Sequence, residues 1–201
     1  MPARLLLASA NPGKVAEFRR ILAGVDVTLL DAGDVTLPEV EETGGTFAEN
    51  ALLKARAAAA ATGLPSVADD SGLVVDALGG APGVHSARYA GAHGNDQANL
   101  DLVLERMRGV TPRTARFVCV AALAAPDGQE WTAEGVLEGR LTEHPRGDQG
   151  FGYDPVFQPL GESRTTAEMA PEEKDAISHR GQAFRALRPA IAALLTGDDA
   201  G

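Results

Sequence analysis

Two adjacent carboxylates, Asp69 and Asp70, constrain what this chain can fold into more than any other feature of its sequence. They follow the run 64–68, which has the character of a core strand, and Ser71 and Gly72 come directly after them. Neighbouring like charges are unfavourable unless a positive group lies close by. At the end of a buried strand, a metal ion or lysine side chains would provide that charge, whereas a solvated acidic turn would need neither. The pair alone leaves both interpretations open.

Composition narrows the class of protein. With 201 residues, of which 44% are hydrophobic and 23% charged, the chain suits a globular protein with a sizeable core. Its length suits one large domain or two tightly joined lobes, which we expect over residues 1–196, and a flexible tail is expected over 197–201. The net charge of −10 argues against a nucleic-acid partner and favours divalent cations near clustered carboxylates. No run is long enough to span a membrane and the first residues lack a signal-peptide pattern, so we expect a cytoplasmic protein without a membrane partner.

A strand-to-helix turn near the start of the chain is a candidate phosphate site. The apolar residues 5–8 predict a strand, and Asn11 and Pro12 are typical of an N-cap and a first helical residue. Such a helix start can bind phosphate. Lys14 is unfavourable in the first turn of a helix, so an anion close to it would explain its position. The alternative is a well-capped turn without a ligand.

A second candidate region combines an acidic loop with a helix. Glu41 and Glu42 lie in the loop, and the helix is expected from Thr46, three residues before Glu49 as in a capping box, to about residue 62. Asn50 and Lys54 are four residues apart, so they share a face of this helix. A single lysine is usually solvated, but Asn50 and the acidic loop nearby favour a site at Lys54.

Further along the chain, residues 116–124 and 131–141 are expected strands joined by a hairpin at residues 126–128. Cys119 lies in the first of them and has no second cysteine to pair with, so we expect a buried, unreactive thiol. His93 lies in a polar loop and is expected to be solvated. An apolar stripe on the helix expected over 96–108 predicts either core or a dimer surface.

Two late segments complete the candidates. Residues 147–155 contain three glycines, two aromatic residues and two carboxylates, which suits a loop that approaches a ligand; anchoring of that loop to the core is the alternative. His179 and Arg180 lie at the start of the last expected helix, where they would donate to ligand oxygens or remain solvated. These segments suit a polyphosphate ester bound with Mg²⁺ when they are combined with the acidic residues and the lysines of the chain. The acidic residues are Glu41, Glu42, Asp69 and Asp70, and the lysines are Lys14, Lys54 and Lys174.

The motifs also resemble, in order and over nearly the whole chain, the inosine triphosphate pyrophosphatase family of noncanonical purine (dITP/XTP) pyrophosphatases. The matching segments are residues 9–14, 41–44 with Asn50 and Lys54, 68–73, 78–83, 86–89, 150–155 and 177–181. Ser9-Ala10 replaces the Thr-Gly that is usual in the family, and the hydroxyl is retained.

The resemblance implies an α/β fold with a long central mixed β-sheet flanked by helices, and two lobes with a nucleotide cleft between them. It further implies Mg²⁺-dependent hydrolysis of ITP, dITP and XTP to the monophosphate and pyrophosphate by a homodimer.

The site residues that the resemblance implies fall into three groups. Glu42 and Asp70 would bind the metal, with Glu41 a further candidate, and Asp70 would also be the general base. The phosphates would be bound by Lys54 and by Ser9, Ala10, Asn11, Pro12, Gly13 and Lys14. Ser71 would touch the substrate, and the base would be flanked or reached by Phe151, Gly152, Tyr153, Asp154, Lys174, His179 and Arg180, the last three with the phosphates as alternative partners.

Two rival functions share the phosphate-side features. One is a pyrophosphatase for dUTP or a modified pyrimidine nucleotide, and the other is a nucleotide sensor without turnover. The adjacent carboxylates and Lys54 argue against the sensor. The roles of Asp69 and Asp70 are expected to differ, because neighbouring side chains of an extended strand point to opposite faces.

Overall fold

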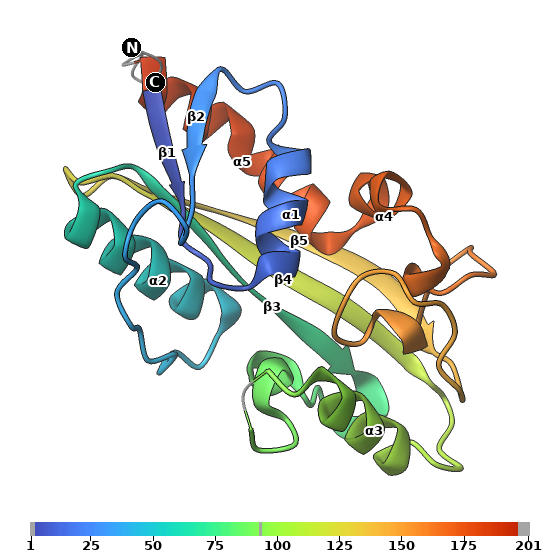
Figure 1. The fold of residues 1–201 in the computed structure, drawn as a ribbon. Helices are drawn as coiled ribbons and strands as arrows, with labels where there is room; N and C mark the ends of the chain where they lie inside the picture. Colours follow the sequence, from blue (N-terminus) through green and yellow to red (C-terminus); the bar gives the residue numbers. More distant parts are fainter. Residues whose placement is uncertain (1–2, 93, 197–201) are drawn as a thin grey trace. The chain divides into compact units, whose positions relative to one another are not determined.

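The computed structural model of the chain describes residues 3–92 and 94–196 (Figure 1). The expected flexible tail at 197–201 and the expected solvated His93 therefore lie outside the described residues. No helix among the described residues is long and apolar enough to cross a membrane.

The structure is built on one six-stranded sheet with the strand order β2-β1-β3-β4-β5-β6. The strands are β1 (Ala3–Leu7), β2 (Val27–Leu30), β3 (Ser66–Val75), β4 (Thr114–Ala124), β5 (Glu130–Leu141) and β6 (Phe157–Pro159). Strand β1 pairs in parallel with β2 and β3, whereas β5 and β6 are antiparallel, so the sheet is mixed. The helices are α1 (Pro12–Ile21), α2 (Phe47–Thr62), α3 (Asp96–Arg106), α4 (Pro171–Ile177) and α5 (His179–Thr196). The expected α/β class with a mixed sheet is confirmed.

The chain divides into two compact units. The first contains the described residues up to Asp70, Cys119–Gly135 and those from Arg180 onward; the second contains Ser71–Val118 and Val136–His179. The boundary crosses β3 between Asp70 and Ser71. The expected nucleotide cleft between two lobes stays a prediction.

Local sequence signals explain where the helices of the first unit begin. Asn11 caps α1 by accepting a hydrogen bond from the amide of Lys14, and Pro12 is the first helical residue. Thr46 and Glu49 form the expected capping box at the start of α2, and Gly63 ends that helix in the left-handed conformation, with φ of 66°. Both helices therefore begin where their capping residues predict.

Strand alternation gives the first unit two cores. Leu5, Leu7 and Val67 pack with Phe18 of α1 and Phe184 of α5. Ala68, Val120 and Ala122 belong to a different cluster with the alanines of α2. Neighbouring residues of β3 therefore pack alternately with α1 and α5 or with α2.

The second unit has its own core around α3. Leu100 and Val103 of this helix pack against Leu73 of β3 and against Phe117 and Phe157. The apolar stripe of α3 is thus core. The segment 125–129 forms the expected tight connection between β4 and β5, in which the amide of Ala125 donates to the Gln129 carbonyl over 2.9 Å.

One expectation about β3 was wrong. The acidic pair was expected at the end of a core strand or in a turn, but Asp69 and Asp70 lie in the middle of one ten-residue strand, and both are buried. The strand continues because cationic side chains pair with both carboxylates, so neither charge needs solvent at a strand end.

Candidate functional site

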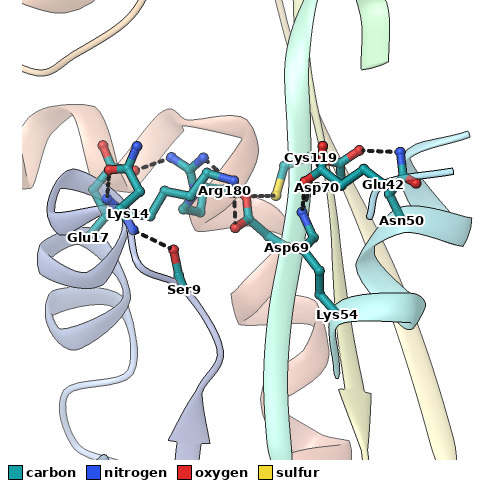
Figure 2. Close-up of polar contacts among 11 residues, drawn as sticks. Ser9, Lys14, Glu17, Glu42, Asn50, Lys54, Asp69, Asp70, Cys119 and Arg180 are labelled. Atoms are coloured by element: carbon teal, nitrogen blue, oxygen red, sulfur yellow. Dashed lines mark hydrogen bonds and ion pairs between the residues drawn. The ribbon is translucent and has the colours of Figure 1, made fainter. Parts of the chain in front are cut away.

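Asp69 and Asp70 point to opposite faces of β3, as the alternation predicts. Figure 2 shows Lys14 and Arg180 on one side of the strand and Glu42 and Asn50 on the other. Each carboxylate therefore has its own set of partners.

Asp69 lies in a buried network of charges. Its side chain is 1% exposed, and it accepts from the Lys14 ammonium over 3.0 Å and from the Arg180 guanidinium over 3.1 Å. Arg180 also forms an ion pair with Glu17 of α1, and both of these side chains are buried. Burial by itself would raise the pKa of Asp69, but the neighbouring cations, led by Lys14, outweigh it and hold the pKa well below its usual range. Asp69 therefore stays ionised.

The anion that explains the position of Lys14 is thus a carboxylate of the protein itself. Asn11 and Pro12 of the turn before it are exposed, and Ser9 is half-buried with its hydroxyl accepting from the Asn11 amide over 3.2 Å. Ala10 is exposed and Gly13 half-buried in the same turn. The turn has the geometry of a capped helix start, and its contact with phosphate stays a prediction.

Asp70 belongs to a second set of contacts. It accepts from the Asn50 amide and from the Lys54 ammonium, each over 3.2 Å, and Lys54 also donates to Glu42 over 2.8 Å. Asn50 additionally accepts from the amide of Gly44 over 2.8 Å, which ties the acidic loop to α2.

Two cations contact the single carboxylate of Asp69, whereas at Lys54 one cation contacts two carboxylates. Burial raises the pKa of Asp70, and the lysines only partly offset burial because Glu42 and Asp69 add negative charge. Burial tends to lower the pKa of the Lys54 ammonium, but the surrounding carboxylates, led by Asp70, outweigh it and raise this pKa. The Lys54 ammonium thus pairs with two carboxylates, those of Glu42 and Asp70. A further cation would offset the remaining negative charge.

The donor set at Asp70 fits Mg²⁺. Asp70 and Glu42 present carboxylate oxygens to the same ammonium, and Mg²⁺ takes one or two protein carboxylates while keeping several waters. Of the two neighbouring glutamates, Glu42 contacts Lys54, whereas Glu41 is exposed. Within 3–92 and 94–196, no three His, Cys, Asp or Glu side chains gather as a metal site. A cation would therefore depend on water and substrate for its remaining ligands.

In the second unit, Asp154 connects the glycine-rich loop to α4. It is 2% exposed and accepts from the Phe151 amide over 3.0 Å, from the Thr166 hydroxyl over 2.8 Å and from the Lys174 ammonium. The Lys174 ammonium also lies 5.1 Å from the centre of the Phe151 ring. The loop needs Gly150 because its φ is +76° and a Cβ there would lie 2.1 Å from Asp154 Oδ2.

The other predicted residues of this unit differ in how they are fixed. Tyr153 is buried and donates its hydroxyl to the Ser86 carbonyl over 2.8 Å, so this aromatic ring anchors the loop, whereas Phe151 is half-buried. The amide of Gly152 donates to Asp96 over 3.0 Å. The buried His179 ring stacks on Phe117 with centroids 4.8 Å apart, which excludes the solvated alternative for it. Ser71, half-buried, is the first residue of this unit.

Sequence patterns missed three residues that position these groups: Glu17, Thr166 and Asp96. Glu17 carried a signal, since a carboxylate next to Phe18 and four residues before Ile21 falls on the apolar side of α1. Thr166 is 12 residues from its partner Asp154, and Asp96 is 56 residues from its partner Gly152. No local sequence pattern marks either residue.

Comparison with known proteins adds independent information. A sequence model of the Ham1 family matches residues 5–190. The chain is 58% identical, over 96% of its length and 98% of the relative, to a dITP/XTP pyrophosphatase of Streptomyces avermitilis. Among solved structures it is similar to a HAM1 protein from Coxiella burnetii, with a TM-score of 0.85, 44% identity and coverage of 94% and 98% of the two chains. A nucleoside-triphosphatase / dITP/XTP pyrophosphatase from Mycobacterium abscessus matches with a TM-score of 0.73, 50% identity and coverage of 92% and 99%.

Proposed function

The chain belongs to the Ham1 family, and from this premise we propose how it acts on its substrates. It is a nucleoside-triphosphate pyrophosphatase, a hydrolase of noncanonical purine nucleoside triphosphates, as its relatives' names indicate. The proposal is that ITP, dITP and XTP are cleaved between the α- and β-phosphates, giving the monophosphate and pyrophosphate, with Mg²⁺ as the cofactor. A homodimer in the cytoplasm is the expected form, and light scattering after gel filtration tests the dimer.

The observation that carries the proposal is the division of labour between the adjacent aspartates. Asp69 is ionised and fully engaged with Lys14 and Arg180, so it positions cations. Asp70 is the aspartate beside Lys54 and Glu42, where carboxylate oxygens and a cation lie within one hydrogen bond of each other. A phosphoryl-transfer centre needs both kinds of group together.

Mg²⁺ would be bound by Glu42 and Asp70, with Glu41 as the less favoured ligand because its side chain is exposed. When bound, the ion lowers the pKa of a coordinated water and offsets charge on the phosphate oxygens. Asp70 would accept the proton of the water that attacks the α-phosphorus in line with the departing pyrophosphate. Lys54 would neutralise charge on the triphosphate.

The family resemblance implies the remaining substrate contacts. The turn Ser9–Lys14 would contact phosphate through a helix start whose Lys14 is held by Asp69. Phe151–Asp154 would flank the purine, with Lys174 oriented by Asp154. Ser71 would touch the substrate.

Selectivity would rest on hydrogen bonds to the base. Hypoxanthine and xanthine carry a 6-oxo acceptor where adenine has an amino donor, so donors such as His179 or Arg180 favour the former bases. A site that relies on such hydrogen bonds discriminates strongly against the analogue that cannot make them. Guanine shares the 6-oxo group, so its rejection has to arise at the 2-amino position.

The experiment is a nucleotide panel with pyrophosphate release as the readout, in the presence of Mg²⁺ and again with a chelator. ITP, dITP and XTP should be hydrolysed far faster than GTP and dUTP, and only with Mg²⁺. A preference for dUTP would replace the purine proposal with the pyrimidine rival. Binding of ITP without turnover would establish the sensor instead.

A further inference from the structure

The second unit contains a cavity that the proposed function does not use. Its volume is about 540 Å³, within the range of small-molecule sites. It lies where β5 ends and the chain returns to β6. Its lining includes Arg113, Arg140, Glu143, His144, Arg146 and Gln158.

The charge of this cavity is opposite to that of the chain. Three guanidinium groups line it against one carboxylate, Glu143, although the whole chain has a net charge of −10. Positive charge gathered in a concave surface raises the local concentration of anions.

Two of the guanidiniums converge on a neutral acceptor. Arg140 and Arg146 donate to the same amide oxygen of Gln158, over 3.3 and 3.5 Å. Among the described residues, no carboxylate forms an ion pair with Arg140, whereas Arg146 pairs with Glu168 over 3.6 Å and donates to the Ser163 carbonyl over 3.2 Å. Two exposed guanidiniums thus share one neutral acceptor, and one carboxylate, Glu168, pairs with one of them. The pair therefore retains positive charge and N–H donors for a ligand.

The rest of the wall is fixed in place. Gln158 is 8% exposed, and its amide nitrogen donates to the Glu162 carbonyl, which sets the direction of its oxygen. Arg113 donates to three main-chain carbonyls, those of Met107, Leu141 and Thr142, and so joins the end of α3 to the end of β5. Arg113 and the Gln158 oxygen are therefore held in place before any ligand binds.

We propose that this cavity binds a small multivalent oxyanion, a phosphate- or carboxylate-bearing molecule whose oxygens lie between the guanidiniums of Arg140 and Arg146. Planar guanidiniums match such oxygens in paired hydrogen bonds, which are among the stronger polar contacts in proteins. Arg113 and His144 add charge and a further donor at the wall.

The test is calorimetric titration of the full chain, in chelator, with inorganic pyrophosphate and separately with citrate. The double variant R140Q/R146Q should lose one binding event, or bind at least about tenfold more weakly there. That event should persist in Arg116→Gln, which removes a half-buried arginine of the same unit paired with Asp76, and in Lys14→Gln/Lys54→Gln. Loss for pyrophosphate alone identifies a phosphate ligand, and loss for citrate alone identifies a carboxylate ligand.

Isotherms of R140Q/R146Q that superimpose on those of the wild type would overturn the proposal. If the double variant does not fold, the wild type still decides the question through the Nε–H signals of its labelled arginines in NMR spectra. Arg140 and Arg146 should shift on addition of pyrophosphate or citrate while Arg116 does not, and unchanged signals of the pair would overturn the proposal.

Discussion

Replacing Asp69 by asparagine removes one charge from a buried network and should unfold the protein more easily. Arg180 is 3% exposed and would lose the carboxylate that contacts two of its nitrogens, at 3.3 and 3.1 Å. Lys14 would lose its partner at 3.0 Å.

The expected loss of stability depends on the partners that Arg180 and Lys14 keep in the variant. Breaking a buried ion pair from one side costs about 3–5 kcal/mol. Arg180 keeps Glu17, and Lys14, 17% exposed, can reach water, so the lower end of about 3 kcal/mol applies. For a chain of this size, that loss lowers Tm by about 6–12 °C.

The same substitution at Asp70 should not destabilise the protein. Burial and the neighbouring carboxylates raise the pKa of Asp70, which means that folding disfavours its charged form. Asp70→Asn removes that cost, and Lys54 keeps Glu42 as a partner. Without metal, the Tm of this variant should equal or exceed that of the wild type.

The assay is thermal unfolding in chelator at neutral pH, checked by urea unfolding. Asp76→Asn is the matched control, because Asp76 is half-exposed and its pair with Arg116 is worth at most about 1 kcal/mol. Equal Tm losses in Asp69→Asn and Asp70→Asn would refute the unequal roles of the two aspartates.

Two further pairs of variants test the remaining contacts. Glu42→Gln should lower kcat by at least about tenfold and raise the Mg²⁺ requirement, whereas exposed Glu41→Gln should change neither; the reverse order would transfer the metal role to Glu41. Gly150→Ala should cost at least about 2 kcal/mol in urea unfolding and raise KM for ITP, because its Cβ would meet Asp154 and its φ is positive. Gly152→Ala, with a positive φ but open space, should cost about 1 kcal/mol; equal losses would show that contact with Asp154 contributes nothing.

Signals within a few residues predicted the start of the site's helices. Asn11, Pro12 and the Thr46–Glu49 capping box act over one turn, and the structure has each helix where they place it. The opposite directions of Asp69 and Asp70 also followed from strand geometry alone.

Such local signals do not predict ion pairs between residues that are far apart in the sequence. Arg180 reaches Asp69 across 111 residues and is buried, although a solvated side chain was one open alternative for it. Lys174, also buried, reaches Asp154 across 20 residues. Local patterns carry no information on which distant carboxylate offsets the desolvation of a cation. For the same reason, the acidic pair was placed at a strand end rather than within β3.

The most direct test of the account is steady-state hydrolysis of ITP by Asp70→Asn with saturating Mg²⁺. Because this variant lacks the general base, kcat should fall at least about 100-fold, while KM for ITP should change little. Turnover close to that of the wild type would contradict the assignment of the chemistry to Asp70.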